Sequence, residues 1–169
     1  NPEAAVDELM EFVKGPDFPT GGIILGQDGI RSAYATGHGR IVVRARAYTE
    51  TASGTGHRQI VVTQLPYQTN KAALVERIAR LVKDKKITGI SELRDESDRQ
   101  GMRIVIEIKR EGQVEQVLNS LYKYTPMQSA FFANMLALVS GQPRVISLKE
   151  ALSNYIDFRR QVITRRSRF

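Results

Sequence analysis

Three carboxylates within four positions are the side chains of this sequence that most resemble a reactive or metal-binding group. Asp95, Glu96 and Asp98 stand close enough to form a carboxylate pair or a magnesium site. Arg94 and Arg99 are interleaved with them, and surface charge pairs of this kind rarely contribute much. We therefore interpret the group as a solvated, charged turn.

The two histidines, His38 and His57, could meet across a hairpin and start a metal site. The sequence offers no third ligand and contains no cysteine, so we predict neither a metal site nor thiol chemistry. Gly37-His38-Gly39 lacks the third glycine of a dinucleotide-binding loop and precedes a strand instead of following one. We expect no cofactor within this chain.

Basic side chains are the remaining candidates for a function. The net charge is +7, and residues 1–39 carry two basic and six acidic side chains, residues 40–110 carry 15 and eight, and residues 111–169 carry eight and four. A basic middle and end favour a polyanion, nucleic acid first, as the partner. Each basic side chain taken alone is more often a solvated charge than a phosphate contact. The candidates for contacts with a phosphate backbone are Arg40, Arg44, Arg46, Arg58, Lys71, Arg77 and Arg80.

Two strands and a helix must position these cations. Alternating residues predict a strand over Arg40–Thr49, with Ile41, Val43 and Ala45 facing a core and the arginines and Tyr48 facing away. A second strand over Gln59–Leu65 should pair with it antiparallel. Asn70–Lys83 has the apolar spacing of an amphipathic helix whose opposite face is basic.

The stretch Gly89–Arg110 predicts an antiparallel hairpin at the centre of the sheet. Its second strand alternates apolar and polar residues from Met102 to Lys109, as expected for one buried face. Gly101 ends the charged turn, where a positive φ carries no steric cost.

The rest of the chain completes an α+β fold, an antiparallel sheet packed with helices. A helix capped by Asn1, a short strand over Ile23–Leu25, and helices over Gly29–Thr36 and Val114–Tyr122 are predicted. Ser129–Val139 is almost wholly apolar and fits a buried strand or a buried helix. We favour a strand, because Gly141-Gln142-Pro143 resembles a hairpin turn.

A last helix begins at Ser147, where Glu150 completes a capping box. It has no stop signal before Phe169, so we expect the chain to be a fragment. No apolar run reaches the roughly 18 residues needed to cross a bilayer, and residues 1–3 lack the order of a signal peptide. Together with the absence of cysteine, this is compatible with a cytoplasmic location and no membrane partner.

Four segments together resemble a known family. They are GPDFPTGG (Gly15–Gly22), RARAYTE (Arg44–Glu50), Leu65–Arg110 with its ISELRDESDRQGMRIVIE motif, and ISLKEAL (Ile146–Leu152). They resemble the A subunits of bacterial DNA gyrase, with the A-type subunits of topoisomerase IV as the close second. Sequence reasoning alone does not separate these two.

The resemblance implies a part of a type IIA DNA topoisomerase, the enzyme that passes one duplex through a transient break in another. Residues 1–22 would be a helix and connector from a winged-helix region, 23–146 the α+β tower domain, and 147–169 the start of a coiled-coil arm. The tower supports the bent arms of the cut duplex. The intact A subunit forms a homodimer, and a gyrase B-type partner subunit supplies ATP binding and magnesium.

The resemblance also implies what this chain lacks. The family's nucleophilic tyrosine directly follows an arginine and lies upstream of this region. In Arg46-Ala47-Tyr48-Thr49-Glu50 an alanine intervenes, the tyrosine falls in a predicted strand, and no activating base is near in sequence. We therefore expect no catalytic residue here and an inactive isolated fragment.

Two other classes of protein stay open. A basic α+β module that binds RNA should expose aromatic side chains for base stacking, and only Tyr48 is a candidate on the basic strand. A protein–protein scaffold would bind no DNA at any salt concentration.

Overall fold

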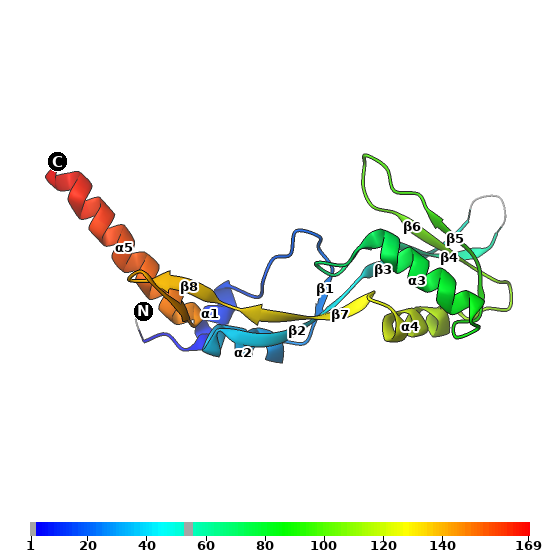
Figure 1. Ribbon diagram of the computed structural model, residues 1–169, viewed down its shortest axis with the longest axis horizontal. Helices are drawn as coiled ribbons and strands as arrows, with labels where there is room; N and C mark the ends of the chain where they lie inside the picture. Colours follow the sequence, from blue (N-terminus) through cyan, green and yellow to red (C-terminus); the bar gives the residue numbers. More distant parts are fainter. Residues whose placement is uncertain (1–2, 53–55) are drawn as a thin grey trace. The chain divides into compact units, whose positions relative to one another are not determined.

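The computed structural model describes residues 3–52 and 56–169 and has the expected α+β architecture with antiparallel sheets (Figure 1). The cap expected at Asn1 lies outside the described residues. The elements in chain order are α1 (Val6–Phe12), β1 (Ile23–Leu25), α2 (Asp28–Thr36), β2 (His38–Arg44), β3 (Arg46–Thr51), β4 (Arg58–Gln64), α3 (Lys71–Lys83), β5 (Ile90–Asp95), β6 (Ile104–Ile108), α4 (Val114–Tyr124), β7 (Gln128–Asn134), β8 (Leu136–Val139), β9 (Gln142–Val145) and α5 (Leu148–Arg168).

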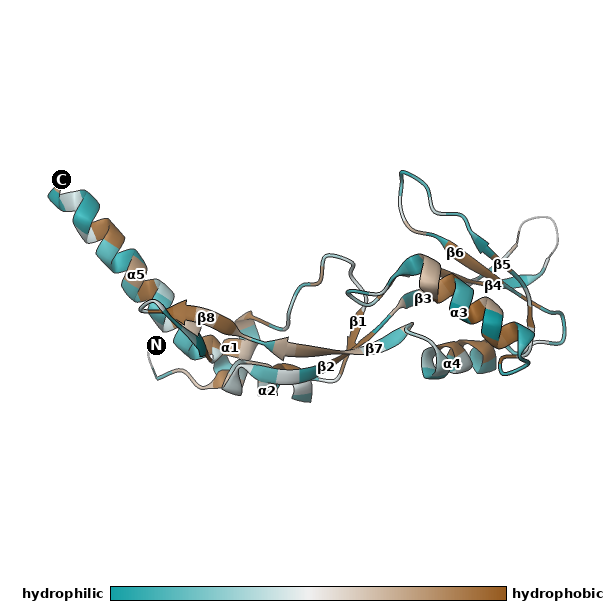
Figure 2. Cartoon of the chain, viewed as in Figure 1, coloured by the Kyte–Doolittle hydropathy of each residue, from teal (hydrophilic) through white to brown (hydrophobic). Residues whose placement is uncertain are grey.

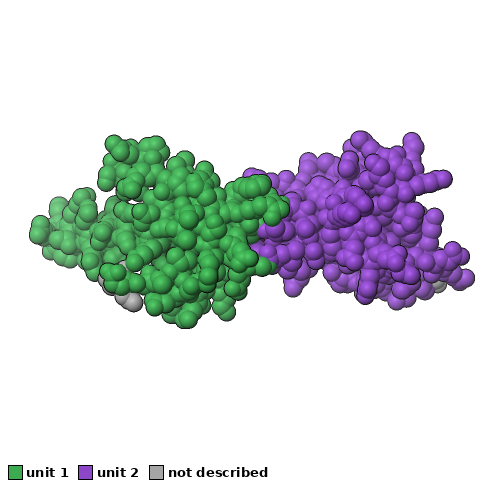
Figure 3. Space-filling view, turned by 90° about the horizontal axis from the view of Figure 1, so that it is seen from below, with its two compact units in different colours: residues 1–17, 26–41, 130–169 green, residues 18–25, 42–129 purple. Residues whose placement is uncertain are grey.

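The chain divides into two compact units (Figure 3). Unit 1 contains residues 1–17, 26–41 and 130–169, and unit 2 contains residues 18–25 and 42–129. The boundaries of these units differ from those of the three segments that the family resemblance implies, 1–22, 23–146 and 147–169. The three segments stay a prediction. The boundaries of the units fall inside β2 and β7, two strands of a three-stranded sheet with the order β1-β2-β7.

Unit 2 is built on a four-stranded antiparallel sheet with the order β3-β4-β6-β5. Ile60 pairs with Ile106 and Val62 with Ile104 across β4 and β6, so these side chains share one face because successive residues of a strand point to opposite sides. Helices α3 and α4 pack on that face, and the hydrophobic residues of these strands and helices are brown in Figure 2. The helix residues of this core are Leu74, Ile78, Leu81, Val114, Val117 and Leu121.

Unit 1 holds α1, α2 and α5 together with the β8–β9 hairpin. Helix α2 lies very close to the start of β2, because two glycines leave no side chain between them. A Cβ on Gly39 would lie 2.2 Å from the carbonyl oxygen of Gly29, and one on Gly29 would lie 2.1 Å from the carbonyl oxygen of Arg40. At the start of α5, Ser147 and Glu150 form the predicted capping box.

The structure corrects two predictions about the sheet. The single strand expected over Arg40–Thr49 is two strands, because Ala45 belongs to neither and its amide donates to the carbonyl of Met127. Only β3 pairs with β4, whereas β2 pairs with β1. The central hairpin forms as predicted, but β5 is an edge strand and only β6 lies inside the sheet.

Candidate nucleic-acid interface

The outer face of the unit 2 sheet carries a network of charged side chains opposite the core. Across β3, β4, β6 and β5, the register aligns Glu50, Gln59, Glu107 and Glu92 in one row. In the next row with the same facing, Val61 and Val105 lie between Tyr48 and Arg94. Both valines are at most 1% exposed. The polar side chains around them therefore shield a thin apolar layer from water.

Two arginines pair with four acids on this face. Arg94 pairs with Glu92, with Glu96 at 3.1 Å and with Glu107 at 3.2 Å. Arg103 pairs with Glu50 and with Glu96, and its guanidinium also donates to the Tyr48 hydroxyl at 3.1 Å. We call Glu50, Glu92, Arg94, Glu96, Arg103 and Glu107 the sheet-face network.

Hydrogen bonds from these arginines shift the pKa values of the network carboxyls. The bond from Arg103 lowers the pKa of Glu50, and the bonds from Arg94 and Arg103 lower that of Glu96. A carboxylate oxygen of Glu107 accepts from Nδ1 of His57 at 2.6 Å, and this contact, followed by that of Arg94, lowers the pKa of Glu107. With four acids and two arginines, the face offers no surplus of positive charge to a phosphate.

The charged turn is more ordered than its interpretation as a solvated turn implies. The Asp95 carboxylate lies 2.7 Å from the Lys71 ammonium and accepts from the Ser97 hydroxyl, and these contacts, that of Lys71 first, lower its pKa to about 2. The Asp98 side chain accepts from the backbone amides of Gln100 and Gly101. Among residues 3–52 and 56–169, no group of three or more His, Asp or Glu side chains is arranged to hold a metal ion.

Replacing Asp95 by asparagine tests the Lys71–Asp95 pair. A carboxyl whose folded pKa is lowered stabilises the fold above its unfolded pKa, and this contribution is lost as the pH falls toward about 2. We expect Asp95→Asn to lower the free energy of unfolding by at most about 1 kcal/mol at pH 7, because exposed pairs are screened. Thermal unfolding between pH 7 and pH 2 should show the difference from wild type disappear in acid. A difference that is the same at every pH would contradict this, and Asp17→Asn, at an exposed carboxylate, is the control.

Four of the seven cations proposed for phosphate contacts are held by other groups. Lys71 binds Asp95, Arg80 binds Glu76 one helical turn away, and Arg58 donates to the carbonyl of Gly112. Arg44 is half-buried and has several contacts. Its guanidinium donates twice to the Gln128 amide oxygen, at 2.9 and 2.7 Å, and stacks 4.3 Å from the centre of the Tyr122 ring.

The other three candidates, Arg40, Arg46 and Arg77, are exposed. Within the part of the chain that the structure describes, their side chains form no hydrogen bond or ion pair. Arg46 and Arg77 belong to unit 2 and Arg40 to unit 1, so the common arginine face expected on one strand is not a feature of either unit.

The structure also reveals cations that sequence reasoning passed over. Four exposed basic residues follow α3 and β6. Their signal in the sequence was present, as two short basic pairs that follow α3 and β6. Lys86 and Lys109 are 23 positions apart, however, and the surface hollow that both line is not visible without the fold. These residues are Lys85, Lys86, Lys109 and Arg110.

Comparison with known proteins identifies the family to which this chain belongs. A family model that describes the A subunits of DNA gyrase and topoisomerase IV matches residues 1–169. The chain belongs to this DNA gyrase/topoisomerase IV family of A subunits. The resemblance inferred from the four sequence segments is therefore confirmed.

The relatives of this gyrase-family chain cover it completely. It is 62% identical over 170 residues to the DNA gyrase A subunit of Dehalogenimonas lykanthroporepellens, covering 100% of this chain and 21% of the relative. It is 58% identical over 169 residues to that of Clostridium acetobutylicum, covering 100% and 20%. The chloroplastic/mitochondrial DNA gyrase A subunit of Arabidopsis thaliana is 52% identical, covering 100% and 18%.

The chain spans about a fifth of the length of these curated relatives. Of the helices in the described residues of this gyrase-family chain, none is both long and apolar enough to cross a membrane.

Proposed function

We propose that this chain is the tower part of a DNA gyrase A subunit, where it supports the bent gate duplex during ATP-dependent strand passage and supercoiling. The observation that carries the proposal is the identity of 52–62% across the whole chain to proteins named as DNA gyrase A subunits. In the intact cytoplasmic enzyme the A subunit forms a homodimer, and a B-type partner subunit binds ATP and magnesium. The same region of a topoisomerase IV A subunit is the second candidate.

The physical role of such a part is to hold the DNA backbone without reading its sequence. Bending a duplex of the size of a binding site costs about 1–6 kcal/mol, and contacts between protein cations and phosphates offset that cost. Unit 2 has the exposed cations that this role requires, including Arg46 and Arg77. An RNA-binding module is less well supported, because Tyr48, the aromatic candidate for stacking, contacts Arg103 in the sheet-face network, where four acids outnumber two arginines and repel a polyanion.

A chimera tests the proposal. The corresponding segment of the Clostridium acetobutylicum DNA gyrase A subunit is replaced by this chain, and the product is combined with ATP, magnesium and the partner B subunit. We expect ATP-dependent supercoiling of a relaxed plasmid, as measured by gel electrophoresis. A folded, dimeric chimera that binds the partner subunit but does not supercoil would contradict the proposal.

The chain by itself should not cleave DNA. Covalent catalysis requires a hydroxyl activated by a base or a metal, and the Tyr48 hydroxyl instead accepts a hydrogen bond from Arg103. We expect no covalent protein–DNA adduct after denaturation with detergent, even when ATP, magnesium and the partner subunit are present. An adduct that forms with wild type and disappears with Tyr48→Phe would show that this assignment is wrong.

A further inference from the structure

The exposed side of α3 carries a row of basic side chains. Arg77, Arg80 and Lys83 follow one another at a spacing of three residues, and all three are exposed. Residues at this spacing are neighbours on a helix surface, about 5–6 Å apart. Arg80 pairs with Glu76 at the surface, a contact that contributes little and is easily exchanged.

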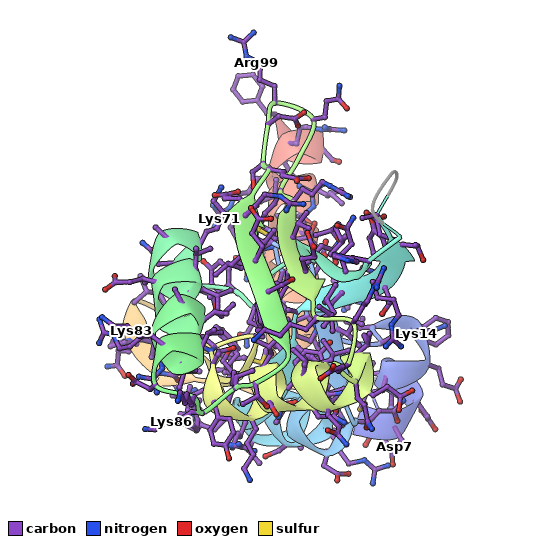
Figure 4. All side chains as sticks on the ribbon, turned by 90° about the vertical axis from the view of Figure 1, so that its right-hand side faces the viewer. Asp7, Lys14, Lys71, Lys83, Lys86 and Arg99 are labelled. Carbon is purple, nitrogen blue, oxygen red and sulfur yellow. The ribbon has the colours of Figure 1, made fainter. Side chains whose placement is uncertain are left out.

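The row continues into the turn that follows α3. Lys85 adopts a left-handed conformation with φ of 56°, and the amide of Lys86 bonds back to the carbonyl of Leu81 at 2.9 Å. This turn closes the helix and leaves both lysine side chains exposed. Figure 4 shows Lys83 and Lys86 at the same end of α3, with Lys71 at the other end.

A second basic turn, from β6 to α4, lies beside the first. The amide of Lys109 donates to the carbonyl of Gly89 at 2.8 Å, and Lys86 and Lys109 line the same surface hollow of about 430 Å³. Arg58 donates to the carbonyl of Gly112 in this turn, so one of the cations expected from the sequence borders it. We call the six cations of these segments that are unpaired within the described residues the cation row, and leave out Arg80, which pairs with Glu76. They are Arg77, Lys83, Lys85, Lys86, Lys109 and Arg110.

The cation row differs from the sheet-face network in how its charges are used. In the described ranges, 3–52 and 56–169, none of its six side chains forms an ion pair, although Asp84 and Glu111 are adjacent in sequence. In the sheet-face network the acids outnumber the arginines, and both guanidinium groups are already paired with carboxylates. Unit 2 therefore has one face closed to polyanions and one edge open to them.

We propose that the cation row binds the sugar-phosphate backbone of duplex DNA. This rests on the proposed function and adds to it the surface of unit 2 that meets the duplex. The row has charge without an aromatic side chain, whereas single strands are held by cations together with stacking platforms. Its cations lie on one helix and two turns, and exposed cations of this kind contact phosphates without base readout.

The test removes three cations of the row and compares salt dependence. Wild type and the variant Lys83→Gln/Lys86→Gln/Lys109→Gln are titrated with a fluorescent duplex of about 30 base pairs, from about 50 to 200 mM salt, where phosphate contacts dominate the affinity. Each contact contributes about 0.9 to the slope of log K against log salt, so the slope should fall by about 2.7. The control Lys14→Gln/Arg99→Gln/Arg144→Gln removes the same charge at exposed positions outside the row and should change the slope by less than half as much.

Each other outcome contradicts the proposal, and the outcomes differ in whether they also contradict the proposed function. Wild type that binds the duplex while the row variant keeps its slope, with thermal unfolding unchanged, would exclude the row and leave the proposed function intact. Equal loss of slope in row and control variants would mean that only net charge matters. Tighter binding of an RNA duplex of the same length would reject DNA as the partner. No salt-dependent binding by wild type would overturn both the row and the proposed function.

Discussion

Alanine in place of Gly39 is expected to destabilise unit 1 by about 3 kcal/mol or more, the upper part of the range for overpacked sites. The new Cβ would lie 2.2 Å from the Gly29 carbonyl oxygen and 2.7 Å from the Ala33 amide nitrogen. Both neighbours are backbone atoms of α2, so the clash with the new Cβ cannot be relieved by the rotation of a side chain. The helix would have to move off β2, and the buried side chains of Ile30 and Ala33 would lose their packing.

Urea unfolding followed by circular dichroism measures this effect, and Gly26→Ala is the matched control. Gly26 has a φ of 75° but no atom within 4 Å of its ideal Cβ, so alanine there adds only left-handed strain, about 1–2 kcal/mol. Gly29→Ala should behave like Gly39→Ala, since its Cβ would meet the Arg40 carbonyl. If Gly39→Ala cost no more than Gly26→Ala, the close approach of α2 to β2 would be refuted.

Elements that depend on neighbouring residues were predictable from the sequence. Ser147 and Glu150 form a capping box because both partners lie within one helical turn. Gly37 ends α2 with a φ of 80°, as a glycine after a helix is expected to do. The ambiguous apolar run before Gly141 forms β7 and β8 as favoured. The turn is Ser140–Gly141, however, and Gln142 and Pro143 already belong to β9.

Features that depend on distant partners were not predictable. Alternation correctly put Ile41, Val43 and Ala45 in the interior, but it continues unchanged through Ala45. The break between β2 and β3 is therefore set by the bond from the Ala45 amide to Met127, 82 positions away.

The sheet-face network has the same origin. Arg103 meets Glu50 and Tyr48 only because β3, β4 and β6 align in one register. A sequence shows that these residues are charged or polar, but it does not show which strands will be neighbours. The assignment of DNA contacts from charge alone failed to separate free cations from paired ones for this reason.

Arg44 and Arg46 provide the sharpest test of that distinction, because one is enclosed and the other exposed. Reversing Arg44 to glutamate removes two hydrogen bonds to Gln128 and the stacking on Tyr122, and it brings a carboxylate toward the Gln128 oxygen. Lost charge-assisted bonds and cation–π stacking together predict a loss of about 2–4 kcal/mol in the stability of unit 2.

Arg46→Glu is the matched reversal at an exposed position. Its side chain has no partner in the described residues, so the free energy of unfolding should change by less than about 0.5 kcal/mol. If Arg46 meets a phosphate, the slope of log K against log salt should fall by about 0.9. Thermal unfolding and anisotropy titration of the two single variants separate stability from DNA binding. An Arg44→Glu protein with wild-type stability and weakened DNA binding would show instead that Arg44 faces the duplex, and that its contacts with Tyr122 and Gln128 are dispensable.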